Sequence, residues 1–247
     1  MSEDVVIVTG ANNGIGLGLT KALAARGSRV AGLDLSVENL AGLNSFVCDV
    51  TDPRQVETVV ASVIQTWGRI DILVNNACLA FYSPFEEKSI ADTRREFEVN
   101  YYGYVNLIRV VLPYMKAEGR GVIHNFSSTV GTSGFAGIYG YASTKGAIEA
   151  LSRTLALEFA AYGIVVNIIH PPLTRTRSSA PLGLPASLMA DPDTVGRKLA
   201  AKIGSRKALI TPGLAESVAV FMTRLLPEAM GSFLSQRAAA ARKMASR

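Results

Sequence analysis

Residues 5–16 read Val5-Val6-Ile7-Val8-Thr9-Gly10-Ala11-Asn12-Asn13-Gly14-Ile15-Gly16. The first four are apolar at every position, which is typical of a strand buried on both faces in a parallel sheet. The spaced glycines let a backbone come close to a pyrophosphate, and a helix N-terminus offers free N–H groups and a positive dipole end. The stretch therefore predicts a strand, a phosphate-binding turn and the start of a helix. We expect a dinucleotide to contact Gly10, Asn13, Gly14, Ile15 and Gly16.

The alternation of short apolar runs and helix-length segments continues along the chain. Further strands are expected over residues 29–33, 45–48, 70–74, 121–126 and 164–169, with a last one near 208–210. Helices are expected over residues 14–26, 53–67, 89–117, 139–161 and 214–226. This order predicts a doubly wound α/β fold, in which helices cover both faces of a parallel sheet. A chain of 247 residues with 49% hydrophobic content fits one domain over residues 1–247.

Asp34 stands eighteen residues after Gly16, at the end of the second expected strand. Its carboxylate is placed to accept hydrogen bonds from an adenosine ribose, and it would repel a 2′-phosphate. No arginine or lysine stands at Asn12, Asn13 or Leu35 to attract that phosphate. The sequence therefore favours NAD over NADP, with a helix cap or turn as the alternative role for Asp34.

Composition bounds the class of protein. The N-terminus does not resemble a signal peptide, and no stretch approaches the roughly 18 apolar residues of a membrane span, so a cytoplasmic protein is expected. Cys48 and Cys78 are the only cysteines, too few for a disulfide framework or a zinc site, and no metal is expected. Residues 170–247 carry 12 Lys and Arg against 4 Asp and Glu, but no recognised nucleic-acid motif accompanies them.

A candidate catalytic group lies at Tyr141-Ala142-Ser143-Thr144-Lys145. On a helix, a spacing of four residues puts the Tyr141 phenol and the Lys145 ammonium on one face, one turn apart. The cation favours phenolate, and a shift of the phenol pKa from about 10 to neutrality corresponds to about 4 kcal/mol. Such a phenol exchanges a proton with an alcohol or ketone oxygen, while the Ser128 hydroxyl, thirteen residues upstream, hydrogen-bonds the same oxygen. Taken alone, Tyr-x-x-x-Lys is also common on ordinary helix surfaces.

The chain resembles the short-chain dehydrogenase/reductase family over residues 4 to about 176. The resemblance rests on residues in family order and spacing: Gly10, Gly14, Gly16, Asp49, Val50, Asn75, Asn76, Ala77, Asn100, Ser128, Tyr141 and Lys145. It implies a Rossmann fold with the cofactor across the carboxyl ends of the strands. It also implies that Asp49, Val50 and Asn76 belong to the cofactor site. Thr174 and Thr176 would contact the carboxamide and phosphate of the cofactor.

The same resemblance implies a role for each candidate catalytic residue. Tyr141 would be the acid or base, and Ser128 would hold the substrate oxygen. Lys145 would contact the nicotinamide ribose and lower the tyrosine pKa, and Asn100 would keep a water in a proton relay to this lysine. Two positions depart from the family pattern: Cys78 replaces a glycine beside the cofactor groove, and Pro171-Pro172 stands where Pro-Gly is usual.

Four neighbouring residues compete with these assignments. Tyr139 would sit on a different helix face from Lys145, and Ser127, next to Ser128 on a strand, would point to the opposite side. His124 lies inside a strand pattern and His170 at a strand end. Core or supporting roles are therefore favoured for both histidines.

The region after the sixth strand carries no motif. Residues 173–206 are expected to form an irregular substrate lid, whose leucines suit a hydrophobic substrate or pack against the core. The tail, about residues 227–247, is expected to affect association and not chemistry. Apolar residues between 221 and 234 recur at spacings that would line one side of a helix. Packing on the domain or on a second subunit is favoured over a peripheral membrane contact.

These observations lead to one hypothesis and two alternatives. The hypothesis is reversible hydride transfer between a nicotinamide cofactor and a secondary alcohol or ketone, with a hydrophobic substrate favoured. The alternatives are a nucleotide-bound regulator without catalysis and an enzyme like the sugar-nucleotide epimerases, which share Tyr-x-x-x-Lys. The expected partners are the small-molecule substrate and further copies of the chain, in a homodimer or homotetramer. Nucleic acid is not expected as a partner.

Overall fold

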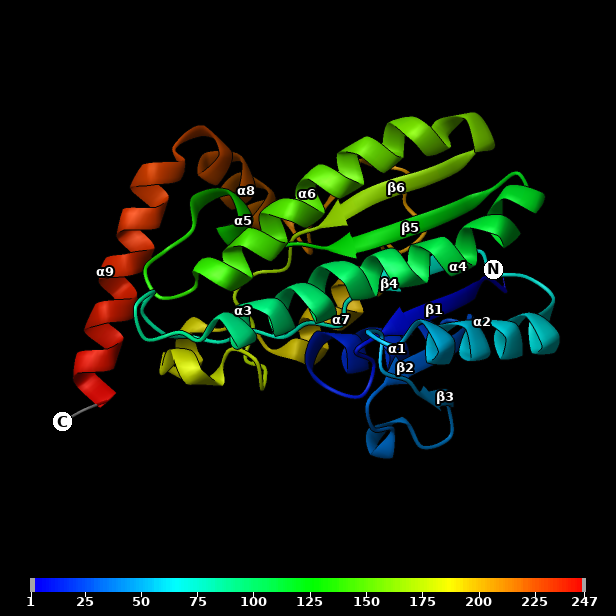
Figure 1. Cartoon of the computed structure of the whole chain (residues 1–247), viewed down its shortest axis with the longest axis horizontal. Helices are drawn as coiled ribbons and strands as arrows, with labels where there is room; N and C mark the ends of the chain where they lie inside the picture. The colour runs from blue at the N-terminus through cyan, green and yellow to red at the C-terminus, as the bar shows by residue number, and fades with distance from the viewer. Residues whose placement is uncertain (1–2, 246–247) are drawn as a thin grey trace.

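A single parallel sheet organises the molecule (Figure 1). The computed structural model describes residues 3–245, so residues 1–2 and 246–247 of the predicted domain lie outside it. Its seven strands are β1 (Val5–Thr9), β2 (Arg29–Asp34), β3 (Asn44–Val47), β4 (Ile72–Asn75), β5 (Gly121–Phe126), β6 (Ile164–Ile169) and β7 (Leu209–Ile210). They pair in the order β3-β2-β1-β4-β5-β6-β7, and the order reverses between β1 and β4. This is the predicted doubly wound Rossmann topology, which places ligands at the carboxyl ends of the strands beside the reversal.

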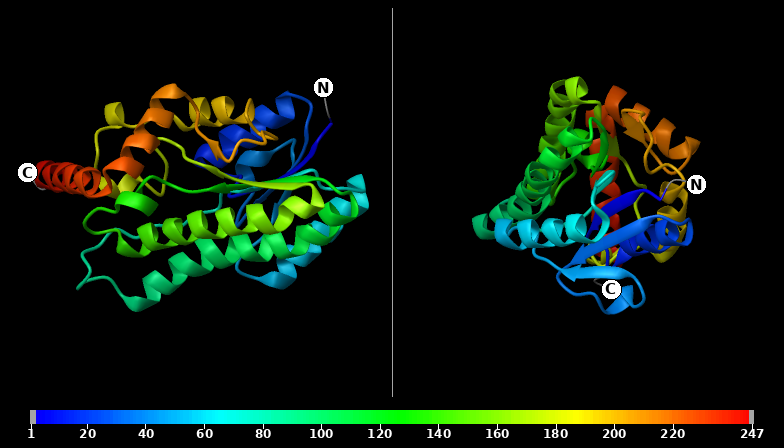
Figure 2. Two further views of the ribbon diagram at one scale, coloured as in Figure 1. Left: turned by 90° about the horizontal axis from the view of Figure 1, so that it is seen from above. Right: turned by 90° about the vertical axis from the view of Figure 1, so that its right-hand side faces the viewer.

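Helices cover both faces of the sheet, as the right-hand view of Figure 2 shows. One face carries α2 (Pro53–Trp67), α4 (Gly103–Ala117) and α6 (Tyr139–Phe159), and the other carries α1 (Gly14–Ala25) and α7 (Pro192–Ala200). Each face has its own apolar core. The core under α2, α4 and α6 includes Val60, Leu107 and Ile123. The core under α1 and α7 includes Leu19 and Leu199. The burial of both faces explains why the strands are apolar at nearly every position.

The predicted helix over residues 89–117 is interrupted. The structure has α3 (Ile90–Phe97), a π-helical segment (Glu98–Tyr102) and then α4. Asn100 lies in the π-helical segment and is fully buried. A π-helical turn inside a longer helix often marks a functional position, because it redirects one side chain.

The predicted irregular lid over residues 173–206 contains a regular helix. Asp191 caps α7 by accepting a hydrogen bond from the Thr194 backbone N–H at 2.9 Å, and Pro192 occupies its first position. The helix packs closely on α1, since a Cβ added at Gly196 would lie 2.5 Å from the carbonyl carbon of Gly18. Residues 192–200 therefore belong to the second helical layer. The irregular part is shorter and holds two 3₁₀ turns, Ala180–Leu182 and Ala186–Leu188.

The chain ends in two helices, where the sequence predicted one continuous apolar face. α8 (Leu214–Leu225) and α9 (Pro227–Ala245) are separated at Leu226, before Pro227. α9 lies beyond the carboxyl ends of the strands (Figure 1) and packs on the end of α5 (Val130–Ser133). In the part of the chain that is described, no helix is long and apolar enough to cross a membrane.

Candidate functional site

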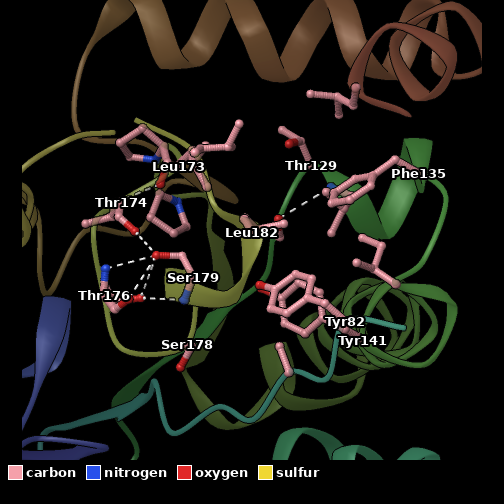
Figure 3. A pocket seen from close by; sticks show the side chains of 18 of the residues that line it. Tyr82, Thr129, Phe135, Tyr141, Leu173, Thr174, Thr176, Ser178, Ser179 and Leu182 are labelled. Atoms are coloured by element: carbon pink, nitrogen blue, oxygen red, sulfur yellow. Dashed lines mark hydrogen bonds between the residues drawn. The ribbon is translucent and has the colours of Figure 1, made fainter. Parts of the chain in front are cut away.

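Two cavities meet at the carboxyl ends of the strands. We call the first the turn cavity, because the turn between β1 and α1 lines it; its volume is about 360 Å³. We call the second the lid cavity, because residues between 171 and 188 form much of its wall; its volume is about 310 Å³ (Figure 3). Both volumes fall in the range of small-molecule sites.

The turn cavity contains most of the predicted cofactor residues. Its wall includes Gly10, Asn13, Gly14, Ile15, Asp34, Asp49, Val50, Asn76, Tyr141, Lys145 and Thr176. Gly16 is not in the wall, and it serves packing instead: a Cβ at this position would overlap the carbonyl oxygen of Gly10. Thr174 also lies outside the turn cavity and lines the lid cavity.

The glycine turn has the backbone geometry that a phosphate site needs. Gly10 and Gly14 have φ of +64° and +56°, in the left-handed region that favours glycine. Asn13 is the N-cap of α1, but its side chain makes no capping hydrogen bond, and the first turn holds no acidic residue. The first N–H groups of α1 therefore stay available to an anion, together with the positive end of the helix dipole. These residues fit the pyrophosphate of a dinucleotide.

Carboxylates and amides at the strand ends shape the rest of the turn cavity. Asp34 accepts hydrogen bonds from the backbone N–H groups of Asn12 and Leu35, both at 2.8 Å. Asp49 accepts one from the Thr51 N–H at 2.9 Å. The Asn76 side chain donates to the carbonyl oxygens of Thr9 at 2.9 Å and Gly10 at 3.1 Å, which fixes the glycine turn against β4. The cavity therefore has a rigid polar wall at its strand ends.

Three of the four predicted catalytic residues lie where the two cavities meet. Tyr141 lines both cavities, Lys145 lines only the turn cavity, and Ser128 lines only the lid cavity. Tyr141 and Lys145 are brought together by their spacing on α6, while Ser128 comes from the end of β5. One phenol is thus accessible from both sides.

The protonation of this group differs from the expectation. Burial raises the pKa of Tyr141, and the neighbouring Cys78, Tyr82 and Tyr104 add to this, while a hydrogen bond with Ser128 lowers it. Burial also lowers the pKa of Lys145. The predicted lowering of the phenol pKa by the ammonium is not found here. The Lys145 Nζ donates to the carbonyl oxygen of Phe126 at 2.8 Å and lies 5.6 Å from the centroid of the Tyr141 ring.

Asn100 lines neither cavity. Its Oδ1 accepts from the Leu79 N–H at 2.7 Å, and its Nδ2 donates to the Leu79 carbonyl oxygen at 2.8 Å and to the Thr144 hydroxyl at 3.1 Å. The side chain therefore ties the segment after β4 to α6, beside Lys145.

Thr174 and Thr176 lie in a loop held by its own hydrogen bonds. The Thr174 hydroxyl donates to the Pro172 carbonyl oxygen at 2.8 Å. The Ser179 hydroxyl accepts from the Thr176 N–H at 2.9 Å and donates to the Thr174 carbonyl oxygen at 2.7 Å. Thr176 lines both cavities, so this loop forms part of the wall between them.

Of the competing residues, Tyr139, His124 and His170 line neither cavity, whereas Ser127 lines the turn cavity. The Ser127 hydroxyl points to the backbone of α6 and donates to the Lys145 carbonyl oxygen at 3.3 Å. The Tyr139 hydroxyl lies 2.8 Å from that of Thr93, away from the cavities. Both histidines are buried: His124 contacts Asn167 at 2.5 Å, and His170 contacts Glu149 at 2.6 Å.

Several residues of the cavity walls were not selected from the sequence. Cys78 lines both cavities, so the residue that departs from the family glycine lies at the junction. Tyr82 lines the lid cavity beside Tyr141 (Figure 3), and burial raises its pKa. Three residues of α9 also line the lid cavity: Phe233, Leu234 and Arg237. No motif marks this helix, and its contribution follows only from its position in the fold. Within the described residues, no cluster of His, Cys, Asp or Glu could hold a metal ion.

Comparisons with known proteins agree with this geometry. The family model for short chain dehydrogenases matches residues 4–184. L-fucose dehydrogenase from Bos taurus is 38% identical over 177 residues, which span 68% of this chain and 64% of the bovine protein. An uncharacterized oxidoreductase from Thermotoga maritima is 34% identical over 226 residues, which span 87% of this chain and 86% of that protein.

A solved structure extends the likeness to nearly the whole chain. A short-chain dehydrogenase from Streptomyces avermitilis superposes with a TM-score of 0.80 at 30% identity, covering 98% of this chain and 99% of that one. The chain thus belongs to the short-chain dehydrogenase/reductase family, whose members are NAD(P)-dependent oxidoreductases that act on alcohols and ketones.

Proposed function

We propose that this protein transfers a hydride between NAD and a hydrophobic secondary alcohol or ketone. The observation that carries the proposal is the position of Tyr141, whose side chain lines the turn cavity and the lid cavity alike. A hydride acceptor in one cavity and a substrate carbon in the other would meet beside this phenol. Proton transfer and hydride transfer at one carbon–oxygen bond require that proximity.

Tyr141 and its neighbours have different roles in the proton transfer. In ketone reduction the Tyr141 phenol gives its proton to the carbonyl oxygen and becomes phenolate, and in alcohol oxidation the phenolate takes the hydroxyl proton. The Ser128 hydroxyl, on the substrate side, hydrogen-bonds the same oxygen as its charge changes. Burial raises the pKa of Tyr141 and lowers that of Lys145, so the neutral phenol is favoured and Tyr141 is ready to donate its proton in ketone reduction. Asn100 positions α6 through Thr144.

The cofactor supplies the hydride acceptor or donor, and the turn cavity would hold it. The N–H groups of α1 and the glycine turn would bind the pyrophosphate, Asp34 would bind the adenosine ribose, and Asp49 and Val50 would hold the adenine end. Thr176, which lines both cavities, and Thr174, which lines only the lid cavity, would contact the carboxamide and phosphate of the cofactor. No described basic residue forms an ion pair with Asp34, while Asn12, Ser36 and Glu38 form a hydrogen-bonded group beside it, which supports NAD over NADP.

The lid cavity supports a hydrophobic substrate. Side chains of Phe135, Leu173 and Leu182 line it, and Leu182 is buried. Burial of apolar substrate surface stabilises the complex by about 25 cal/mol per Å². A secondary alcohol with an apolar body is therefore favoured over a small polar one.

We also infer one catalytic domain that assembles as a homodimer or homotetramer. Apolar side chains on α8 support association, because Leu214, Phe221 and Leu225 are all exposed. Light scattering after size exclusion tests this, and a monomer at micromolar concentration would contradict it.

The experiment that tests the function is a screen for reduced cofactor. Apolar and polar secondary alcohols are incubated with the protein and NAD or NADP, and formation of reduced nicotinamide is followed by absorbance. We expect turnover with NAD and apolar alcohols. Cofactor binding without turnover in either direction would indicate a regulator, and an epimerised product without net reduced cofactor would indicate epimerase-like chemistry.

A further inference from the structure

The C-terminal helix α9 closes one side of the lid cavity. Phe233, Leu234 and Arg237 all line that cavity, and their spacing along α9 places them on one face of the helix. Phe233 and Arg237 are exposed as well as lining the cavity, so this side of the cavity is open to solvent. The helix therefore presents two apolar side chains and one arginine to the lid cavity.

Hydrogen bonds of Ser235 and close packing at Gly231 fix α9 in this position. The Ala136 N–H donates to the Ser235 hydroxyl at 3.0 Å, and that hydroxyl donates in turn to the Gly231 carbonyl oxygen at 2.8 Å. A Cβ added at Gly231 would lie 2.6 Å from the Ser133 carbonyl oxygen, so the helix approaches the end of α5 as closely as glycine allows. These contacts lie two and six residues before Arg237 and fix the part of α9 that carries it.

Arg237 is the only charged residue among the described residues that line the lid cavity. Two other arginines of the C-terminal third have carboxylate partners: Arg224 pairs with Glu149 at 3.1 Å, and Arg175 with Asp191 at 3.6 Å. No described carboxylate lies within ion-pair distance of Arg237. Its guanidinium lies 4.9 Å from the centroid of the Phe233 ring, a contact that holds the cation at the cavity wall.

A lone cation on an apolar wall is suited to an anion at the end of an apolar ligand. The Arg237 guanidinium offers several N–H donors in a planar arrangement that matches the two oxygens of a carboxylate. We propose that the substrate is an anionic amphiphile: its reacting carbon lies at Tyr141, its apolar body fills the lid cavity, and its carboxylate pairs with Arg237. This substrate class rests on the proposed function, but the assignment of the anion site depends on the cavity alone.

The test measures binding, so that it does not depend on turnover. Octanoate and octanamide are matched in length and differ in charge, and each is titrated calorimetrically into the full-length protein. We expect the wild type to bind octanoate more tightly than octanamide. Arg237→Gln should weaken octanoate binding about tenfold, the low end for a hydrogen bond to a charged group, because the site is open to solvent. Octanamide binding should not change.

Two further variants separate charge from structure. Arg237→Lys keeps the cation and should keep most of the octanoate affinity, whereas Arg26→Gln removes an equal charge from the exposed end of α1 and should have no effect. Melting temperatures of all variants should match that of the wild type. Octanoate that fails to bind, binds no better than octanamide, or binds Arg237→Gln equally well would overturn the proposal.

Turnover then distinguishes this proposal from the proposed function. A methyl ketone that bears a terminal carboxylate, and its methyl ester, are compared as substrates. We expect about a tenfold higher kcat/KM for the acid, through KM, and loss of this preference in Arg237→Gln with kcat unchanged. Charge-selective binding without turnover of either ketone would overturn the proposed function and leave the anion site standing. Turnover of both ketones at equal kcat/KM would overturn the anion site alone.

Discussion

The turn cavity and the lid cavity lie on either side of one phenol, but they are built differently. The turn cavity is formed by backbone: two glycines with positive φ, the N-terminus of α1 and the ends of successive strands. The lid cavity is formed by side chains from segments far apart in the chain, including Tyr82, Leu182 and Phe233. Backbone geometry demands particular residues at fixed spacing, whereas an apolar wall accepts many combinations of similar volume. The first cavity therefore carries recognisable motifs and the second does not.

This difference predicts separable effects of substitution. Changes in the turn cavity should alter cofactor affinity and choice. Changes in the lid cavity should alter the KM of the substrate. Only the residues at the junction should alter both the chemistry and the binding of either ligand. The following variants test that separation.

The largest effect is expected for Lys145→Ala. Lys145 is buried, lines the turn cavity and contacts the face of the Tyr141 ring, so its loss should reduce kcat at least about 100-fold and weaken NAD binding as well. Steady-state rates and calorimetric titration of NAD measure the two effects. Lys21→Ala, on the exposed side of α1, is the matched control. A variant with more than a tenth of the wild-type rate would contradict the role of this lysine.

Acid should destabilise the contact between the sheet and the segment before β7. Burial lowers the pKa of His124 to about 4, and its Nε2 accepts from the Gly204 N–H at 3.0 Å, which requires the neutral ring. The folded pKa is below the unfolded value of about 6.5, so this stability is complete above that pH and falls as the pH drops toward 4. The loss is at most about 3 kcal/mol. Urea unfolding between pH 7 and 4.5 measures it.

The control for this measurement is His124→Gln, which should start less stable and lose much of the pH slope. Equal slopes for variant and wild type would show that His124 does not carry the acid sensitivity. Hydrogen exchange at Gly204 should accelerate in the same pH range, since the protonated ring cannot accept its N–H.

A smaller effect is expected for the cofactor preference. Asp34 lines the turn cavity and Leu35 is 69% exposed beside it. Asp34→Ala with Leu35→Arg removes a repulsive charge and adds an attractive one, which should shift the ratio of kcat/KM for NADP over NAD by about tenfold or more. Leu35→Arg alone is the control and should shift the ratio less. A wild-type enzyme that already prefers NADP would show that our interpretation of Asp34 is wrong.

The smallest effect is expected for Gly231→Ala, at the contact that holds α9 beside the lid cavity. The new Cβ would meet the Ser133 carbonyl oxygen at 2.6 Å and push α9 away from the cavity. We expect KM for an apolar substrate to rise a few fold, with kcat and NAD affinity unchanged. Ser232→Ala, at the neighbouring exposed position, is the control and should behave as wild type. A change in NAD affinity would contradict the separation of the two cavities.

The sequence was sufficient for the parts of the fold that depend on local pattern. All seven strands were predicted within a few residues, because strands buried on both faces are apolar throughout. The grouping of Tyr141 with Lys145 followed from helical spacing, and the position of Ser128 from the end of β5. The glycine turn was recognisable because its backbone takes positive φ at Gly10 and Gly14, which favours glycine at both positions.

Other features depend on distant contacts, which a local pattern does not record. Asn100 in the π-helical segment bonds to Leu79 and Thr144, which lie 21 and 44 residues away in the chain. The start of α7 had a local signal, Asp191 before Pro192, but the prolines and glycine around it favoured an irregular segment. The direction of α9 depends on Ala136 and Ser133, about a hundred residues earlier, so its place in the substrate cavity was not predictable. The high pKa of Tyr141 likewise depends on burial by residues from several segments.

The central claim is that Tyr141 moves the proton for a hydride transfer between the two cavities. It is tested most directly by Tyr141→Phe, with NAD affinity and turnover measured on the same sample and Tyr139→Phe as the matched control, since Tyr139 contacts Thr93 away from both cavities. We predict NAD affinity near that of the wild type and a loss of turnover of at least about 100-fold for Tyr141→Phe, with little change for the control. A Tyr141→Phe protein that keeps more than a tenth of the wild-type rate would contradict the claim.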